Sequence, residues 1–405
     1  MARSARNELK KPLPAAGRID VIPGIRVLAI GLIAWFHIWQ QSWLMPYIHL
    51  GARTIDLAAL PRAGYIWVDM FIFLSAFQLA LPYMSRHIDS RPLPGIADFY
   101  RRRALRILPS YLLSVIVCFI IALALRQYPN GLAAAKDLFA QLTFTQTFNI
   151  YTYMGTNINV VLWTVAILVQ FYLLFPFIVR LFVKKPIAAV AVMIAAATLY
   201  RVLFVNSNPN PGMYVNQLPA FLDVLAAGIL AAYAYEAVSR KEGVGKYHFV
   251  FTIVSIGSLA VIYLLMKDLS GLYGVENLQH WQGINRPWVA LSFAVFVFST
   301  ALASKWWRFL FSNKIMVFLA SVSYNYYIWH QYIAVKLKLL RFPPSSAELP
   351  NQAGEQPWQS LYTLCAFLIP VLVAWLITWL YEGKLIPLLF AGNRKLPENQ
   401  APDKQ

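Results

Sequence analysis

Long apolar runs alternate with short polar connections along almost the whole chain. A helix of roughly 20 apolar residues is long enough to cross a hydrocarbon layer of ~30 Å. The pattern predicts about ten membrane-spanning helices, near residues 23–45, 64–84, 107–126, 160–183, 186–205, 216–237, 248–266, 288–304, 315–335 and 358–382. We therefore expect an all-α polytopic membrane domain over residues 21–385, between polar tails at 1–20 and 386–405.

The composition excludes an ordinary soluble domain. Hydrophobic residues make up 59% of the 405 positions and charged residues only 13%, whereas roughly 25% charged is usual in soluble proteins. The first twenty residues are polar and no apolar segment precedes Ile22. We interpret them as a cytosolic tail and not as a cleaved signal peptide.

The net charge of +18 calls for an account, because nucleic-acid binding is one explanation of a basic chain. With the N-terminus inside, 23 of the 35 Lys and Arg residues fall in cytosolic segments and 9 in the outer ones. This asymmetry is the positive-inside pattern of membrane proteins. We therefore expect anionic lipids as partners rather than nucleic acid, and both termini in the cytosol.

Two connecting segments have a pattern of their own. The stretch "GIADFYRRRALRILPSY" carries four arginines among apolar residues, which predicts an amphipathic helix at the cytosolic face that ends near Pro109. On the outer side, residues 133–144 are predicted to form a short interfacial helix. The outer connections at 206–216 and 340–357 are rich in Asn, Pro and Gly, as turns require.

The first apolar run is bracketed by two ionisable residues, Arg26 and His37. Eleven helical residues advance about 1100°, so both side chains lie on one face, ~16 Å apart along the axis. Ionisable groups within a bilayer are costly and commonly functional. This face is thus expected to line a cavity, with Arg26 at the cytosolic edge and a neutral, proton-accepting His37 deep in the membrane.

Counting the helical rise from each predicted membrane edge brings Asp69, Asp223 and His330 to the depth of His37. Each residue also has a purely structural interpretation. Asp69 can cap a helix or pair within the bundle, Asp223 can pair with Arg201, and His330 can be an interfacial histidine. For His37, a merely satisfied hydrogen-bonding role is the less favoured alternative.

Five separate stretches together resemble the acyltransferase 3 superfamily of integral membrane O-acyltransferases, over about residues 20–385. In chain order they are "RVLAIGLIAWFH" (26–37), "VDMFIFLSAF" (68–77), "FYRRRALRILPSY" (99–111), "LWTVAILVQFYLLFP" (162–176) and "SVSYNYYIWHQ" (321–331). The first matches the family's arginine, ten residues, histidine motif. The third carries its paired arginines, Arg103 and Arg106, whose other interpretation is simple positive-inside anchoring.

The resemblance implies a stand-alone O-acyltransferase of the bacterial inner membrane. It implies cytosolic acyl-CoA, most often acetyl-CoA, as co-substrate, with no metal and no permanently bound cofactor. The acceptor would be a hydroxyl of an extracytoplasmic glycan or lipid-linked sugar. Roles carried over from the motifs are His37 as catalytic base, Asp69 as its orienting carboxylate, Arg26, Arg103 and Arg106 as donor-phosphate ligands, and Ser75, Trp163, Tyr172 and His330 as substrate-binding residues.

Three positions depart from the family pattern. Leu168 stands where a glutamate is usual, Ala76 where a glycine completes the second-helix motif, and Trp67 where another glycine is common. Because the glutamate is missing, a non-enzymatic transporter or acyl-donor conduit is retained as the competing class. A purely structural membrane subunit is less favoured, since it would not need an intramembrane arginine–histidine face.

Overall fold

The computed structural model describes residues 19–51 and 53–385, so most of each predicted tail lies outside the described residues. Ten long helices form the body: α2 (Ile22–Ser42), α4 (Trp67–Ile88), α5 (Ile96–Ala124), α8 (Trp163–Lys184), α9 (Pro186–Tyr200), α10 (Leu222–Ser239), α11 (His248–Ser270), α12 (Val275–Leu302), α14 (Lys314–Leu339) and α15 (Trp358–Leu376). Shorter helices are α3 (Ala59–Arg62), α6 (Gly131–Leu142), α7 (Ile150–Tyr153) and α13 (Lys305–Ser312). Two π-helical segments, η4 (Arg201–Asn206) and η8 (Ile377–Leu385), prolong α9 and α15.

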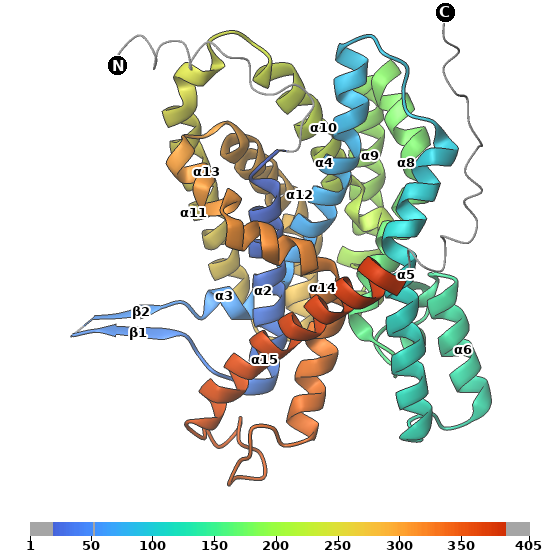
Figure 1. The fold of residues 1–405 in the computed structure, drawn as a ribbon, viewed down its shortest axis with the longest axis vertical. Helices are drawn as coiled ribbons and strands as arrows, with labels where there is room; N and C mark the ends of the chain where they lie inside the picture. The colour runs from blue at the N-terminus through green and yellow to red at the C-terminus, as the bar shows by residue number, and fades with distance from the viewer. Residues whose placement is uncertain (1–18, 52, 386–405) are drawn as a thin grey trace, which may run out of the picture.

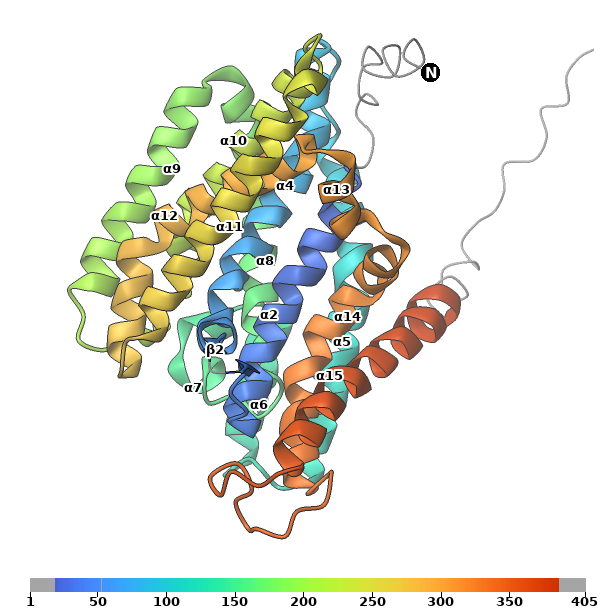
Figure 2. The same ribbon diagram turned by 90° about the vertical axis from the view of Figure 1, so that its left-hand side faces the viewer.

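The long helices run up and down the bundle in alternation (Figures 1 and 2). Helix α4 packs against α10, α2 against α14, and α11 against α12. We call the end with the connections 89–95 and 240–247 the α4–α5 end, and the end with α6 and the connection 340–357 the α6 end (Figure 1). The core between them is dominated by buried aliphatic and aromatic side chains.

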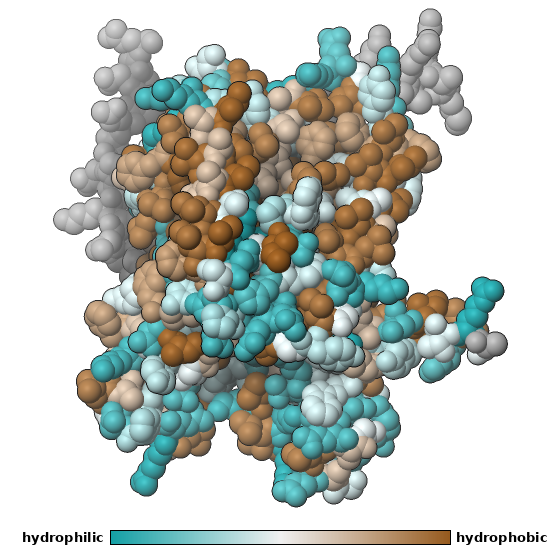
Figure 3. Space-filling view, turned by 180° about the vertical axis from the view of Figure 1, so that it is seen from behind, coloured by the Kyte–Doolittle hydropathy of each residue, from teal (hydrophilic) through white to brown (hydrophobic). Residues whose placement is uncertain are grey.

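Nine helices of the described chain are long and apolar enough to cross a membrane. The predicted span at 315–335, which is not among these nine, corresponds to α14, which has 26 residues and packs on both α2 and α15. Large apolar side chains such as Ile187, Leu264 and Leu372 are exposed on the outside of the bundle. On the side of the molecule opposite to the view of Figure 1, Figure 3 shows hydrophobic side chains over the upper part and hydrophilic ones toward the α6 end. The protein is therefore an all-α integral membrane protein, as predicted.

The prediction of a separate amphipathic helix ending at Pro109 is wrong. Helix α5 continues through Pro109 to Ala124. A proline inside a helix removes a backbone hydrogen bond, and membrane helices tolerate this when neighbouring groups satisfy the freed carbonyls. The carbonyl that Pro109 frees is that of Leu105, four residues earlier. The nearby carbonyls of Ile107 and Pro109 accept from the hydroxyls of Tyr324 at 3.0 Å and Tyr381 at 3.3 Å.

Other boundaries and elements also differ from the expectation. Helix α12 begins at Val275, well before the predicted residue 288, and contains Pro287. A hairpin of β1 (Tyr47–Leu50) and β2 (Arg53–Asp56) projects from the bundle between α2 and α4 (Figure 1). The predicted interfacial helix at 133–144 is confirmed as α6, which is capped by the Asn130 side chain.

Candidate active site

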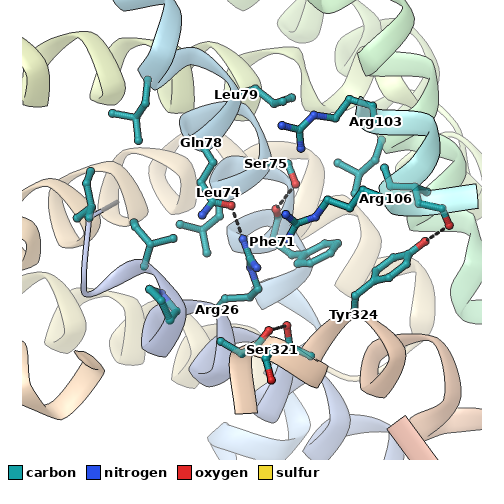
Figure 4. A pocket seen from close by; sticks show the side chains of 18 of the residues that line it. Arg26, Phe71, Leu74, Ser75, Gln78, Leu79, Arg103, Arg106, Ser321 and Tyr324 are labelled. Atoms are coloured by element: carbon teal, nitrogen blue, oxygen red, sulfur yellow. Dashed lines mark hydrogen bonds between the residues drawn. The ribbon is translucent and has the colours of Figure 1, made fainter. Parts of the chain in front are cut away.

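A cavity of about 460 Å³ opens into the bundle at the α4–α5 end. Its walls come from the first turns of α2, the stretch of α4 from Phe71 to Pro82, the arginine-rich part of α5, the first half of α8 and the start of α14, with Glu236 of α10. All three arginines predicted to bind donor phosphates line it. Figure 4 shows the side chains of Arg26, Arg103 and Arg106 converging on one space from α2 and α5.

The three arginines differ in how they are held. Arg26 donates through Nη2 to Oε1 of Gln78. The Nε atom of Arg103 is buried and has no hydrogen-bond partner among the described residues. Arg106 is exposed at the cavity wall. A planar guanidinium donates in a fork that matches phosphate and carboxylate oxygens, so the group forms a site suited to an anion.

A single carboxylate of the described chain, that of Glu236, also lines this cavity. It accepts from Nη2 of Arg240 at 2.7 Å, so its charge is compensated locally. Leu168, at the position of the family's glutamate, lines the cavity as well. The cavity therefore remains positively charged, and its α8 wall is apolar where the family usually has an acid.

Two of the predicted substrate-binding residues line the same cavity. Ser75 on α4 donates to the Phe71 carbonyl at 3.1 Å, and Tyr172 on α8 is buried against the cavity. Both therefore lie on the same side as the three arginines.

His37 and His330 lie together, nearer the α6 end. Their ring centres are 5.4 Å apart, the first ring on α2 and the second on α14. His37 is partly exposed and its Nδ1 lies 3.2 Å from Oε1 of Gln40, whereas His330 is fully buried. The prediction that these two residues share a depth in the bundle is thus confirmed.

The cavity that Arg26 lines does not extend to His37. The cavity includes Phe71 but not His37. Phe71 stacks on Tyr327 with ring centres 5.1 Å apart, and Tyr327 lies 5.7 Å from His330. A continuous series of ring contacts therefore runs from the cavity wall at Phe71 to His330.

The expectation that Asp69 orients the His37 imidazole is contradicted by the geometry. Oδ2 of Asp69 accepts from Nε of Arg286 at 3.0 Å, and both side chains are buried. Arg286 also donates to the Val215 carbonyl at 2.7 Å and lies over the Phe221 ring. The alternative interpretation of Asp69, pairing within the bundle, is the one that the structure supports.

The second buried acid behaves as predicted. Asp223 forms a two-pronged ion pair with Arg201, at 2.9 and 2.7 Å. The Ala220 carbonyl accepts from Arg201 at 2.9 Å and from Arg286 at 3.4 Å, which links the two ion pairs. This four-residue network joins α4, η4, α10 and α12. Arg286 escaped notice in the sequence because the helix was predicted to begin only at residue 288.

The last predicted substrate-binding residue, Trp163, lies apart from both the cavity and the histidines. Its ring contacts those of Tyr153 and Phe221, beside the ion-pair network. Trp67 packs between α11 and α12, where it donates to the sulfur of Met266 and its ring makes a tilted contact with that of Phe293. Of these two aromatic residues, Trp163 is the one that lies beside Arg286, through the shared neighbour Phe221.

Comparisons with known proteins agree with this architecture. The family model described as an acyltransferase domain matches residues 19–379, so the chain belongs to the acyltransferase 3 family. It is 24% identical over 308 residues to the O-acetyltransferase OatA of Staphylococcus aureus (strain NCTC 8325 / PS 47), covering 71% of this chain and 48% of that one. It is 23% identical over 329 residues to a Staphylococcus aureus (strain COL) protein provisionally named an O-acetyltransferase, covering 77% and 50% of the two chains.

The chain spans about half the length of the curated relatives that it matches. No solved structure matches it. Membership of the family rests on most of the transmembrane domain, including every helix that lines the cavity and carries the histidines.

Proposed function

We propose that this protein is a membrane O-acetyltransferase that uses acetyl-CoA from the cytosol. The acceptor would be a hydroxyl of a glycan or lipid-linked sugar on the other side of the membrane. One observation carries the proposal: three arginines converge on a cavity whose α2 wall continues, on the same helix face, to His37. The names of the O-acetyltransferase relatives support the reaction type.

The cavity suits the phosphates of the donor. The unpartnered, buried Nε of Arg103 would gain a hydrogen bond when an anion enters, which removes the cost of a buried donor without a partner. Arg106 is already exposed to the same space. The narrower acyl-bearing arm would then extend along α2 toward Phe71.

The chemistry would take place at His37. Oε1 of Gln40 can only accept a hydrogen bond, so in the neutral imidazole Nδ1 carries the hydrogen and Nε2 keeps its lone pair. Nε2 would remove the proton of the acceptor hydroxyl while the oxygen attacks the thioester carbon. The C–S bond breaks, and the leaving thiolate takes up the proton from the imidazolium. General-base assistance of this kind contributes roughly 10²–10⁴-fold.

The stacked pair of Phe71 and Tyr327 sets a condition on this reaction. The thioester can reach His37 only when the stacked rings of Phe71 and Tyr327 separate. The Tyr327 hydroxyl accepts from Thr164 at 2.7 Å, which holds Tyr327 on α8. Phe71 has no such polar tie, so Phe71 is the ring that would swing aside when the donor arm enters.

The test is transfer by the purified protein in liposomes that contain acetyl-CoA labelled in the acetyl group. The assay measures labelled ester formed on an external sugar acceptor. His37→Ala should abolish transfer at unchanged protein abundance, while His49→Ala, in the exposed hairpin, should leave it intact. Transfer retained by His37→Ala would refute the mechanism, and mass spectrometry of surface glycans with and without the protein identifies the acceptor.

One observation favours a second function, that of a conduit for an acyl donor or another anion. Leu168 removes the acid from the wall of the cavity, and the cavity stops short of His37. The same liposomes separate the two functions. A conduit would move the labelled compound across the membrane without consuming the thioester, whereas a transferase releases free thiol in step with ester.

A further inference from the structure

The histidine pair contains an unsatisfied group. Nδ1 of His330 lies 2.7 Å from the Tyr327 carbonyl, which can only accept, so Nδ1 carries the hydrogen of the neutral ring. Nε2 therefore holds a lone pair. It is buried and has no hydrogen-bond partner among the described residues, although buried polar atoms in proteins are nearly always paired.

The surroundings leave one partner within reach. The titratable groups in ring contact with His330 are His37 on α2 and Tyr326 and Tyr327 on its own helix. The carboxylate that the sequence suggested as a partner of His37, that of Asp69, is bound to Arg286. An imidazolium formed at His37 thus has no carboxylate beside it in the described part of the chain.

The two imidazoles differ in their exposure to solvent. His37 is partly exposed, whereas no part of His330 is accessible. An acceptor hydroxyl would therefore meet His37 first, with His330 behind it. With ring centres 5.4 Å apart the two imidazoles are in contact, close enough for a rotation of the His37 ring to bring one nitrogen of each within hydrogen-bond distance.

We propose that His330 is the proton-holding partner of His37, taking the place that a carboxylate has in other catalytic groups. The proposal rests on the proposed acyl transfer. When the acceptor O–H bond breaks, the new N–H at Nε2 of His37 donates to the lone pair at Nε2 of His330, and the proton is held between the two rings. The ester C–O bond forms, the C–S bond breaks, and the proton passes to the thiolate, which leaves both rings neutral again.

A structural role for His330 makes a different prediction. An asparagine at this position keeps an N–H for the Tyr327 carbonyl and an oxygen that accepts a hydrogen bond. That oxygen does not take up a proton at neutral pH. His330→Asn therefore retains the packing role and removes only the basic lone pair.

The experiment compares wild type, His37→Ala, His330→Asn and the control Tyr326→Phe, which keeps the ring stacked on His330. Transfer kinetics are measured in liposomes, and thermal unfolding in detergent. We expect His330→Asn to lower kcat by roughly 10²-fold with the KM for acetyl-CoA unchanged, because His330 is outside the arginine cavity. Tyr326→Phe should match wild type.

The outcomes are distinguishable. If wild type transfers acetyl groups, His37→Ala does not, and folded His330→Asn keeps kcat within a few-fold of wild type, the proton-holding role is wrong while the proposed function stands. A rise in KM with unchanged kcat would also overturn it. If wild type itself transfers nothing, the proposed function fails and this inference fails with it. Should His330→Asn unfold, His330→Gln provides the same comparison with a longer amide.

Discussion

Substituting Gly228 with alanine should destabilise the crossing of α4 and α10. A Cβ at Gly228 would lie 2.7 Å from the Phe73 carbonyl oxygen, 2.9 Å from Cβ of Ala76 and 3.1 Å from the Phe77 nitrogen. Two of these three atoms belong to the backbone of α4, so the new methyl can be accommodated only if one helix shifts. Ala76 itself replaces the family's glycine, and the glycine opposite it on α10 leaves room for its methyl.

The magnitude follows from comparison with Gly257→Ala on α11, where a Cβ meets nothing within 4 Å. Both variants gain the same helix propensity, about 1 kcal/mol. Their difference therefore isolates the overpacking term, which is typically ~1–3 kcal/mol. Gly228→Ala should be the less stable of the two by that amount.

The assay is thermal or denaturant unfolding of both purified variants in the same detergent, followed by tryptophan fluorescence. A double variant, Gly228→Ala with Ala76→Gly, removes the methyl–methyl contact but not the contact with the Phe73 carbonyl. It should therefore recover only part of the loss. Equal stability of Gly228→Ala and Gly257→Ala would refute the tight crossing.

Four further predictions address the site and its surroundings. Arg103→Ala should raise the KM for acetyl-CoA, since an anion-binding guanidinium is lost, and an unchanged KM would count against the phosphate role. Arg286→Met should cost ~3–5 kcal/mol of stability because it leaves a buried charge on Asp69, and adding Asp69→Leu should restore most of it; additive losses in an unfolding assay would contradict the pairing. Phe71→Ala should open the way between the cavity and the histidines and raise the rate of acetyl-CoA hydrolysis without an acceptor, and an unchanged rate would exclude Phe71 as the barrier. Backbone N–H groups of the 340–357 connection hold the pKa of Glu355 below its usual value. The ionised carboxylate therefore stabilises this connection fully above the ordinary carboxyl range, and the stabilisation disappears as the pH falls through the lowered pKa. Protease cleavage of the connection should increase over that acidic range in wild type but not in Glu355→Gln.

Much of the fold could be predicted because the membrane imposes a length on each helix. Runs of about 20 apolar residues are required to span the hydrocarbon, and these runs located every long helix. A residue that interrupts an apolar run, such as a proline, is harder to interpret. Pro109 indicates a helix end in water, yet α5 continues through it, in a bundle where tyrosines from other elements donate to the nearby carbonyls of Ile107 and Pro109. The sequence around Pro109 does not predict which distant residues donate to these carbonyls.

The candidate site could likewise be predicted from the sequence only in part. Helical rise correctly brought His37 and His330 to one depth, and helical periodicity placed Arg26 on the face of a cavity. Depth does not specify which helices are neighbours around the bundle. For this reason Asp69 was expected beside His37, whereas its neighbour is Arg286 on α12.

The stacked rings of Phe71 and Tyr327 have a consequence for the cell as well as for the reaction. A water-filled pore from one membrane face to the other would let protons and small ions leak whenever no substrate occupied it, and would discharge the membrane potential. By interrupting the path with packed aromatic rings, the bundle keeps the bilayer insulating at rest. Under the proposed mechanism, passage of an acyl group and retention of the ion gradient would thereby be compatible in one protein.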